Sequence, residues 1–222
     1  ENPKAGDIFI DGKRVNDIPA AKRGIGFVFQ SYALFRYMTV FDNIAFGLEI
    51  AKMPKKQIKE RVFELLELTG LSGLENRYPN QLSGGQRQRV AIGRSLLMEP
   101  RLIIADEPIA SLDISIQAQI VMLFKKLQQE KRFSFLFIAH DLSMVRFLSD
   151  TTGVMKNGKL VEMAPTKELF ENPQHPYTQS LLSAIHIPDP LEERKRKLIE
   201  YEEPQSLGEG WKELSACHCV RI

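Results

Sequence analysis

Three short apolar segments constrain the fold of this chain more than any other feature of its sequence. They are residues 24–29, 102–105 and 133–139. Apolar runs of this length are typical of strands in a parallel sheet that is buried on both faces. Gln30 follows the first segment, Asp106 and Glu107 the second, and His140 the third. Because open α/β sheets bind ligands at the carboxyl ends of their strands, we expect the two carboxylates at such an edge. An exposed acidic turn is the alternative.

Helical patterns separate these strands along the chain. Apolar residues recur at helical spacing at positions 58, 62, 65, 66 and 68, and again at 116, 120, 123, 124 and 127. Residues 142–148 predict a further, shorter helix, and residues 32–71 predict a helical lobe inserted between strands. Asp11-Gly12 and Asn157-Gly158 predict the tight turns of two hairpins. The alternation of strands and helices predicts an α/β fold with a mainly parallel sheet.

The composition is ordinary for a globular protein. With 222 residues, 43% of them hydrophobic, the chain can bury one substantial core and a smaller lobe. The formal net charge of +2 is too small to indicate nucleic-acid binding. No segment approaches the roughly 18 uninterrupted apolar residues of a membrane-spanning helix. We therefore expect any action at a membrane to take place from the aqueous side.

The C-terminal part combines a turn, a helix and a charged stretch. Residues 172–176 predict the turn, positions 177, 181, 182 and 185 a short amphipathic helix, and residues 192–197 an exposed helix. Cys217 and Cys219 flank His218 near the end of the chain. A structural zinc site needs two separated pairs of ligands, so this single cluster does not predict one.

Residues 82–86, Leu-Ser-Gly-Gly-Gln, precede a helical pattern over residues 87–98. Gly84 and Gly85 lack a Cβ atom and allow the backbone to approach an anion closely. The helix directs its unpaired N–H groups and the positive end of its dipole at the same place. This arrangement suits a phosphate group. The alternative is a Ser/Gly turn that merely begins a helix.

In this order and spacing, these features resemble the nucleotide-binding subunits of ATP-binding-cassette (ABC) transporters, over about residues 6–187. The resemblance implies a RecA-like P-loop NTPase core with a mainly parallel sheet, an inserted helical subdomain and a C-terminal extension. It divides the chain into an N-terminal part of the core, the helical subdomain, the rest of the core and the extension. The respective residues are 1–31, 32–88, 89–165 and 166–222.

The resemblance also implies roles for the motif residues. Residues 82–86 match the signature motif, so Ser83, Gly84, Gly85 and Gln86 would contact the γ-phosphate of ATP bound to the opposite subunit. Asp106 matches the aspartate that helps to hold Mg²⁺, a cation that prefers oxygen ligands.

The catalytic roles fall to two other residues. Glu107 matches the residue that polarises the attacking water, and His140 matches the switch histidine at the γ-phosphate. Gln30 matches the residue that senses Mg²⁺ and relays closure to the helical lobe. Asp113 ends the Ser-Leu-Asp loop that links the two sites of the dimer. ATP and Mg²⁺ are the implied cofactors. Taken alone, His140 could instead be a hydrogen-bonded histidine at a strand end.

One departure from the family pattern concerns the phosphate-binding loop. No Gly-x-x-x-x-Gly-Lys-Ser/Thr motif, the Walker A motif, occurs in the 222 residues. That loop supplies backbone N–H groups and a lysine for the phosphates. In the family it lies shortly before a hairpin like residues 6–12. We therefore expect an N-terminally truncated subunit that does not turn over ATP by itself.

The two halves of the chain resemble different importers. Residues 27–48 resemble ATPases that drive import of sulfate, molybdate, iron or polyamines, whereas residues 82–190 resemble those of oligopeptide and dipeptide importers. The C-terminal extension is the rarer feature, so peptide import is the preferred interpretation. A hybrid sequence is a further alternative.

Peptide import implies a set of partners and a location. The partners are a second ABC ATPase subunit, identical or paralogous, integral membrane permease subunits and, indirectly, an extracytoplasmic solute-binding protein, with no nucleic acid. The location is the cytoplasmic face of the cell membrane, as a peripheral subunit. The short interval between Gln30 and Leu82 argues against the soluble ABC ATPases of DNA repair, which carry long coiled-coil insertions there. The peptide-importer-like tail disfavours a translation factor, and Glu107 disfavours a non-catalytic clamp.

Overall fold

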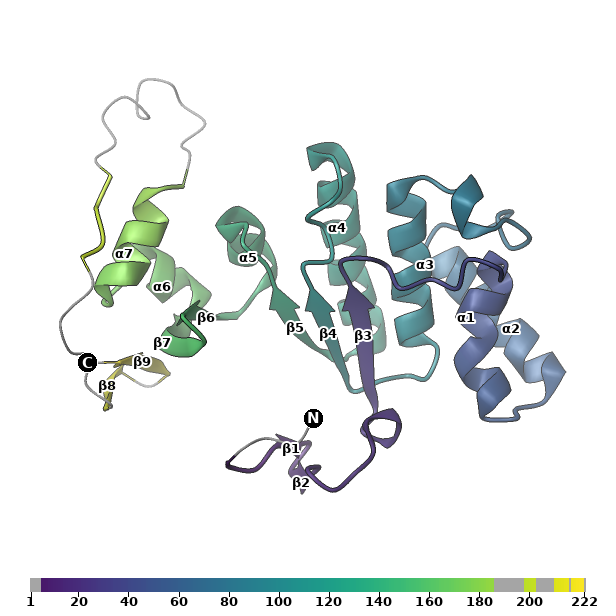
Figure 1. The fold of residues 1–222 in the computed structure, drawn as a ribbon, viewed down its shortest axis with the longest axis horizontal. Coiled ribbons are helices and arrows are strands. Elements are labelled where there is room, and N and C mark those ends of the chain that lie inside the picture. Colours follow the sequence, from purple (N-terminus) through teal and green to yellow (C-terminus); the bar gives the residue numbers. More distant parts are fainter. Residues whose placement is uncertain (1–4, 186–197, 203–209, 216, 222) are drawn as a thin grey trace. The chain divides into compact units, whose positions relative to one another are not determined.

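The computed structural model describes residues 5–185, 198–202, 210–215 and 217–221. The chain forms two compact units, Glu1–Ala139 and His140–Ile222 (Figure 1). Among the described residues, the first unit contains a parallel sheet and a small hairpin, and the second contains an antiparallel sheet.

The first unit contains a parallel sheet of three strands. These are β3 (Ile25–Phe29), β4 (Leu102–Asp106) and β5 (Ser134–Ile138), in the order β3-β4-β5. Phe29, Asp106 and Ile138 occupy one row at the carboxyl edge. The prediction of a parallel sheet from the three apolar segments is confirmed.

Only one face of this sheet is well covered, so the prediction that the strands are buried on both faces is wrong. Val28, Ile103 and Ala105 point to the covered face and are fully buried. Phe124 of α4 lies on this face, 4.8 Å from Phe135 between ring centroids. The other face leaves four large apolar side chains between 42% and 49% exposed: Phe27, Phe29, Leu136 and Ile138. Alternate residues of a strand point to opposite faces, and the helices described in this unit pack on one face.

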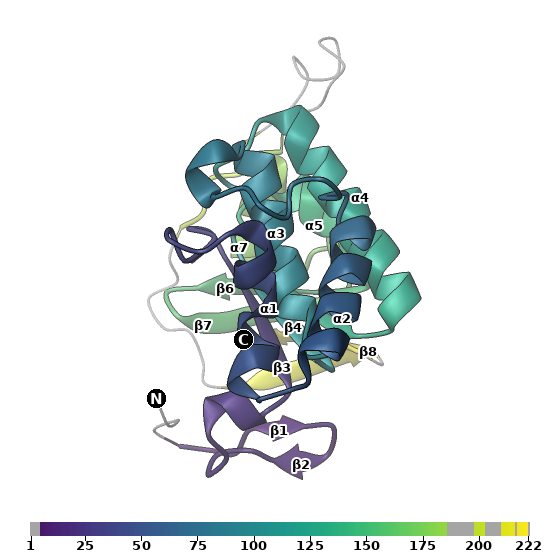
Figure 2. The same cartoon turned by 90° about the vertical axis from the view of Figure 1, so that its right-hand side faces the viewer.

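Four helices accompany the sheet in the first unit. They are α1 (Val40–Ile50), α2 (Lys55–Leu68), α3 (Gly84–Leu96) and α4 (Ile114–Lys131). The short 3₁₀ helices are η1 (Ala20–Lys22) and η2 (Pro79–Gln81). Helices α1 and α2 pack together as the predicted helical lobe (Figure 2). Thr39 begins α1 through a capping box with Asp42, which satisfies backbone donors that the helix leaves unpaired.

The second unit is built on an antiparallel sheet in the order β6-β7-β9-β8. Its strands are β6 (Thr151–Lys156), β7 (Lys159–Pro165), β8 (Trp211–Ser215) and β9 (His218–Arg221). Its helices are α5 (Leu142–Leu148), α6 (Thr166–Glu171) and α7 (Pro176–Ser183). Asn157 and Gly158 have φ of 49° and 74°, which matches the predicted hairpin turn. The charged stretch 192–197 lies outside the described residues.

A buried carboxylate connects β7, β9 and the start of α7. Glu162 is fully buried; it accepts hydrogen bonds from the backbone N–H of Gln174 (2.8 Å) and His175 (3.0 Å) and lies 2.9 Å from Nε2 of His218. Burial alone would raise the pKa of Glu162. The Thr178 hydroxyl lies close to the carboxylate, although it has no hydrogen bond of normal geometry. Together with the contacts from Gln174, His218 and His175, it outweighs the effect of burial, so the pKa of Glu162 is lowered. His218 thus joins a carboxylate, and the described residues include no cluster of three or more metal-ligating side chains.

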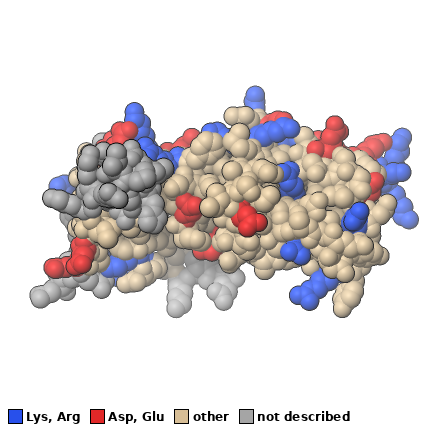
Figure 3. Space-filling model, turned by 90° about the horizontal axis from the view of Figure 1, so that it is seen from above, with Lys and Arg blue, Asp and Glu red and all other residues tan. Residues whose placement is uncertain are grey.

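Figure 3 shows lysines and arginines interspersed with aspartates and glutamates on the surface that it displays. Among the described residues, no helix is long and apolar enough to cross a membrane.

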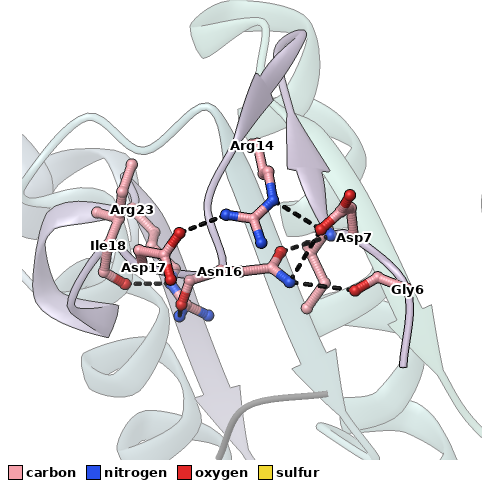
Figure 4. Close-up of polar contacts among 8 residues, drawn as sticks. Gly6, Asp7, Arg14, Asn16, Asp17, Ile18 and Arg23 are labelled. Atoms are coloured by element: carbon pink, nitrogen blue, oxygen red, sulfur yellow. Dashed lines mark hydrogen bonds and ion pairs between the residues drawn. The ribbon is translucent and has the colours of Figure 1, made fainter. Parts of the chain in front are cut away.

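The N-terminal hairpin pairs β1 (Phe9–Ile10) with β2 (Lys13–Arg14) around a turn in which Asp11 and Gly12 have positive φ, as predicted. Figure 4 shows the polar contacts that hold its base. The Arg14 guanidinium pairs with Asp7 at 2.6 Å and also with Asp17, and Asn16 donates to the Gly6 carbonyl at 3.1 Å.

Candidate nucleotide site

The carboxyl edge of the parallel sheet brings together Gln30, Asp106 and Glu107. Asp106 is the last residue of β4, beside Phe29 in β3. Gln30 follows β3 and is exposed, as is Asp106, whereas Glu107 is half-buried. The predicted ligand-binding edge therefore carries an amide and two carboxylates. Mg²⁺ in nucleotide sites is held by one or two carboxylates together with phosphate oxygens and water, so this donor set fits the ion.

Glu107 has a strained backbone. Its φ is +44°, a left-handed conformation that L residues other than glycine adopt rarely. Its N–H donates to the Ile138 carbonyl at 2.9 Å, which fixes it against the end of β5. Strain of this kind persists where the surrounding structure enforces it and is concentrated at functional sites.

The Leu-Ser-Gly-Gly-Gln motif begins helix α3 earlier than predicted. The helix starts at Gly84 and not at residue 87, because Ser83 is its N-cap. Gln86 N–H donates to Ser83 Oγ at 3.3 Å, and Ser83 N–H donates to Gln86 Oε1 at 2.9 Å. This reciprocal pair is a capping box, which satisfies two backbone donors at the helix start. The motif therefore begins helix α3, and its contact with a phosphate stays a prediction.

The two glycines also allow close packing inside the unit. A Cβ atom on Gly84 would lie 3.1 Å from Leu112 Cδ2, and one on Gly85 would lie 2.7 Å from Ile116 Cγ2. Neither glycine has a positive φ. The motif therefore needs glycine where α3 meets the 111–113 loop and α4, a requirement that the sequence did not reveal.

Asp113 is the N-cap residue of α4, but its side chain accepts no capping hydrogen bond. Its carbonyl accepts the N–H groups of Ile116 (2.9 Å) and Gln117 (2.8 Å). The Gln117 side chain donates to the Leu112 carbonyl at 3.0 Å. The backbone of the loop is therefore well held, while the exposed Asp113 carboxylate stays available.

The segment after Gln30 contains contacts that the sequence did not predict. Tyr32 and Ala33 have φ of 61° and 47°. Arg94 of α3 holds them by donating to the Tyr32 carbonyl at 3.1 Å and the Ala33 carbonyl at 2.6 Å. Burial lowers the pKa of Arg94. The Arg87 guanidinium lies over the Tyr32 ring at 5.6 Å.

A groove of about 900 Å³ lies beside this segment. Tyrosines, arginines and other residues from the 31–37 segment, the 78–81 segment and α3 line it: Ser31, Tyr32, Leu34, Arg36, Tyr37, Tyr78, Pro79, Asn80, Gln81 and Arg87. Two of these side chains are cationic and none is acidic. The groove therefore complements a polar segment with carboxylates better than an apolar one.

His140 follows β5 and is exposed. It is the first residue of the second unit, whereas the other predicted site residues all belong to the first. Its neighbour Asp141 caps α5 by accepting the N–H of Ser143 at 2.9 Å.

Comparisons with known proteins show which family this fold belongs to. The family model described as ABC transporter matches residues 1–110, and the model described as the C-terminal region of oligopeptide/dipeptide transporters matches residues 161–211. The oligopeptide transport ATP-binding protein OppF of Bacillus subtilis is 53% identical over 208 residues, which cover 89% of this chain and 68% of OppF. This chain belongs to the ABC transporter family. An OppF protein of Streptococcus pyogenes is 46% identical over 212 residues, which cover 90% of this chain and 69% of that protein.

Another relative is an importer ATPase of a different substrate class. The sulfate/thiosulfate import ATP-binding protein CysA of Synechocystis is 40% identical over 96% of this ABC chain and 59% of its own length. Two solved structures share the fold. The ATP-binding cassette MJ0796, in a dimer bound to ADP and phosphate, has a TM-score of 0.66 at 33% identity over 75% of each chain. CbiO1 of Clostridium perfringens has a TM-score of 0.70 at 32% identity, over 81% of this chain and 73% of its own. The predicted ABC ATPase fold is thereby confirmed.

Proposed function

We propose that this chain is the ATP-binding and ATP-hydrolysing subunit of an ABC importer that takes up oligopeptides or dipeptides. The observation that carries the ATPase role is the Asp106-Glu107 pair at the carboxyl edge of the sheet, where the backbone of Glu107 is strained. The match of residues 161–211 to the oligopeptide/dipeptide transporter region and the OppF relatives support the peptide substrate.

Within this proposal, the edge residues form the hydrolytic end of an ATP site. Asp106 and Gln30 supply oxygen ligands for Mg²⁺, which offsets negative charge on the phosphates when it is bound. Glu107 accepts a proton from the attacking water, a general-base role worth about 10²- to 10⁴-fold in rate. His140, which follows β5 in the sequence, contacts the γ-phosphate.

The signature motif acts on a nucleotide held by the other subunit. Ser83, Gly84, Gly85 and Gln86 present a helix N-terminus to that γ-phosphate, and Asp113 joins the two sites across the dimer. The four-part division at residues 31, 88 and 165 stays a prediction of this proposal.

The open face of the sheet supports the proposal that the phosphate cradle comes from a segment that is not among the 222 residues. Parallel sheets are normally covered on both faces. Here Phe27 and Phe29 stack at 5.5 Å on the open face and are each 42% exposed. Asp106 shares their side of the sheet, so a P-loop segment packed there would bring its phosphates to this carboxylate.

The groove beside Tyr32 supports a permease partner. It follows Gln30 directly in the sequence, in the region where the family contacts its membrane subunits, and its arginines suit an acidic segment. The subunit would work from the cytoplasmic face of the membrane. Co-purification with an integral membrane pair, lost on Arg36→Glu, would support this partner, and capture that does not depend on the groove would contradict it.

ATP turnover tests the central proposal. The purified 222-residue chain should show no appreciable turnover, since each composite site lacks its cradle. In a form of the protein that includes a P-loop, Glu107→Gln should lower turnover by about 10²- to 10⁴-fold. Robust turnover by the 222 residues alone, abolished by Glu107→Gln, would refute an external cradle.

The CysA relative favours a second candidate, an importer of sulfate or a similar anion, because its match spans 96% of the chain. ATP turnover in the assembled importer discriminates the two. Stimulation by a peptide-loaded binding protein supports the first candidate, and stimulation by a sulfate-loaded one supports the second.

A further inference from the structure

Tyr32 connects three parts of the first unit that the sequence keeps far apart. Its side chain lines the groove, its hydroxyl lies 3.1 Å from Ser111 Oγ, and its ring packs under the Arg87 guanidinium at 5.6 Å. A single side chain therefore contacts the groove, the 111–113 loop and helix α3.

The backbone holds Tyr32 in this position. Two consecutive residues with left-handed φ, Tyr32 and Ala33, form a turn that local sequence preference disfavours. Arg94 compensates by donating hydrogen bonds to both carbonyls. Because Arg94 and Arg87 both belong to α3, a shift of the turn is resisted by that helix.

The Tyr32 hydroxyl also lies at the start of α3. A Cβ atom on Gly84 would be 3.4 Å from this hydroxyl and 3.1 Å from Leu112 Cδ2. Little free space separates the hydroxyl, the loop and the first turn of the signature helix, so displacement of the Tyr32 ring must move at least one of them.

We propose that Tyr32 is a positioning residue that holds the 111–113 loop in place beside the signature motif. The Tyr32–Ser111 hydrogen bond is the connection that does this. The expected effect on ATP turnover rests on the proposed function. The Tyr32–Ser111 hydrogen bond itself is a contact within the first unit.

Paired substitutions test the connection in the assembled importer. Tyr32→Phe and Ser111→Ala each remove the same hydrogen bond while keeping the ring and the loop backbone. Each should lower kcat for ATP by about two- to fivefold, the effect of one hydrogen bond, and leave KM for ATP unchanged, because the bond joins two segments of the protein. The double variant should be no worse than either single variant. Additive losses, or a rise in KM alone, would overturn the proposal.

Tyr177→Phe is the matched control. It makes the same chemical change in the second unit, where the Tyr177 hydroxyl has no hydrogen bond among the described residues. This variant should keep the wild-type kcat. An equal loss of kcat in Tyr177→Phe would overturn the assignment to Tyr32.

A second readout does not depend on ATP turnover. Ser83→Arg tests the proposed function, because unchanged ATP turnover of the importer would contradict it. In that case, hydrogen exchange of the 222-residue chain still tests the Tyr32–Ser111 connection. In Tyr32→Phe, the amides of residues 109–113 should exchange about two- to fivefold faster, and those of α2 should not change. Unchanged exchange at residues 109–113 would overturn the connection.

Discussion

At the scale of single residues, Glu107 combines a carboxylate with a backbone conformation that costs stability. Left-handed φ costs an L residue about 1–2 kcal/mol relative to glycine. The N–H of Glu107 is committed to the Ile138 carbonyl, so the strain is maintained by the sheet itself. A position that needed only a turn would be better served by glycine. Glutamate at this position agrees with the proposed catalytic role of its side chain, which stays a prediction.

Stability measurements on two variants can separate the cost of this backbone from the use of the side chain. The free energy of unfolding of Glu107→Gly should be about 0.5–1 kcal/mol higher than that of Glu107→Gln. Relief of the φ strain should outweigh the free-energy cost of the extra entropy that glycine has in the unfolded chain. Urea unfolding of the full chain followed by circular dichroism measures the difference. If Glu107→Gly is the less stable variant, the left-handed backbone is not a source of strain.

At the scale of elements, the glycine pair sets how closely α3 approaches α4. The proposed phosphate contact is one reason for glycine in the motif, and close packing inside the unit is a second. A Cβ on Gly85 would meet Ile116 at 2.7 Å, a distance that neither helix can accept without a shift.

Gly85→Ala should therefore destabilise the first unit by about 1–3 kcal/mol although alanine is the better helix former. Gly47→Ala in α1 is the control, since its Cβ would meet its nearest neighbour at an ordinary 3.4 Å. That control should be neutral or more stable by up to about 1 kcal/mol. Ile116→Ala removes the obstructing methyl, so the double variant Gly85→Ala/Ile116→Ala should lose less stability than the two single losses combined. Strict additivity would argue against the contact.

At the scale of the whole molecule, the two units have different stabilising chemistry. The first is built on a parallel sheet and helices. The second depends on Glu162, whose pKa is lowered, and on His175, whose pKa is also lowered because burial disfavours its charged form. The Nδ1 atom of His175 accepts the N–H of Tyr177 at 3.1 Å, which requires the ring to be unprotonated at that atom.

The second unit should lose stability on acidification. Both groups bind protons more weakly in the folded chain than in the unfolded chain, so their contributions are complete above the ordinary histidine pKa of 6.5. The His175 contribution declines as the pH falls below 6.5, and that of Glu162 as it falls below 4.5. Fluorescence of Trp211, the only tryptophan, reports on β8 of this unit during urea unfolding at several pH values.

Glu162→Gln provides the control for this pH dependence. It should destabilise the second unit at pH 7 by about 2–4 kcal/mol, because an amide cannot satisfy all the donors around the buried carboxylate. It should also remove the decline below pH 4.5. A variant that keeps the full acid decline would show that another carboxyl group is responsible.

Much of the fold could be predicted from local sequence. The three apolar segments, Asn157-Gly158 and the apolar stripe of α4 each determine structure through neighbouring residues. Strands β8 and β9 were not predicted, because β9 pairs with β7 through residues far apart in the sequence, such as Glu162 and Val220. The start of α3 was misplaced because glycine is a poor helix former, and the Ser83 cap overrides that preference.

For the candidate site, residue type and order by themselves determined the prediction of which residues carry chemistry: Gln30, the signature motif, the Asp106-Glu107 pair and His140. The tertiary structure alone decided how they are supported. It placed Tyr32 against Ser111, held the strained backbone of Glu107 at the end of β5 and left one face of the sheet open. The physical reason is that a motif is a local pattern of atoms that can bind a ligand. Contacts such as Tyr32–Ser111 depend on chain segments that meet only after strands pair and helices pack.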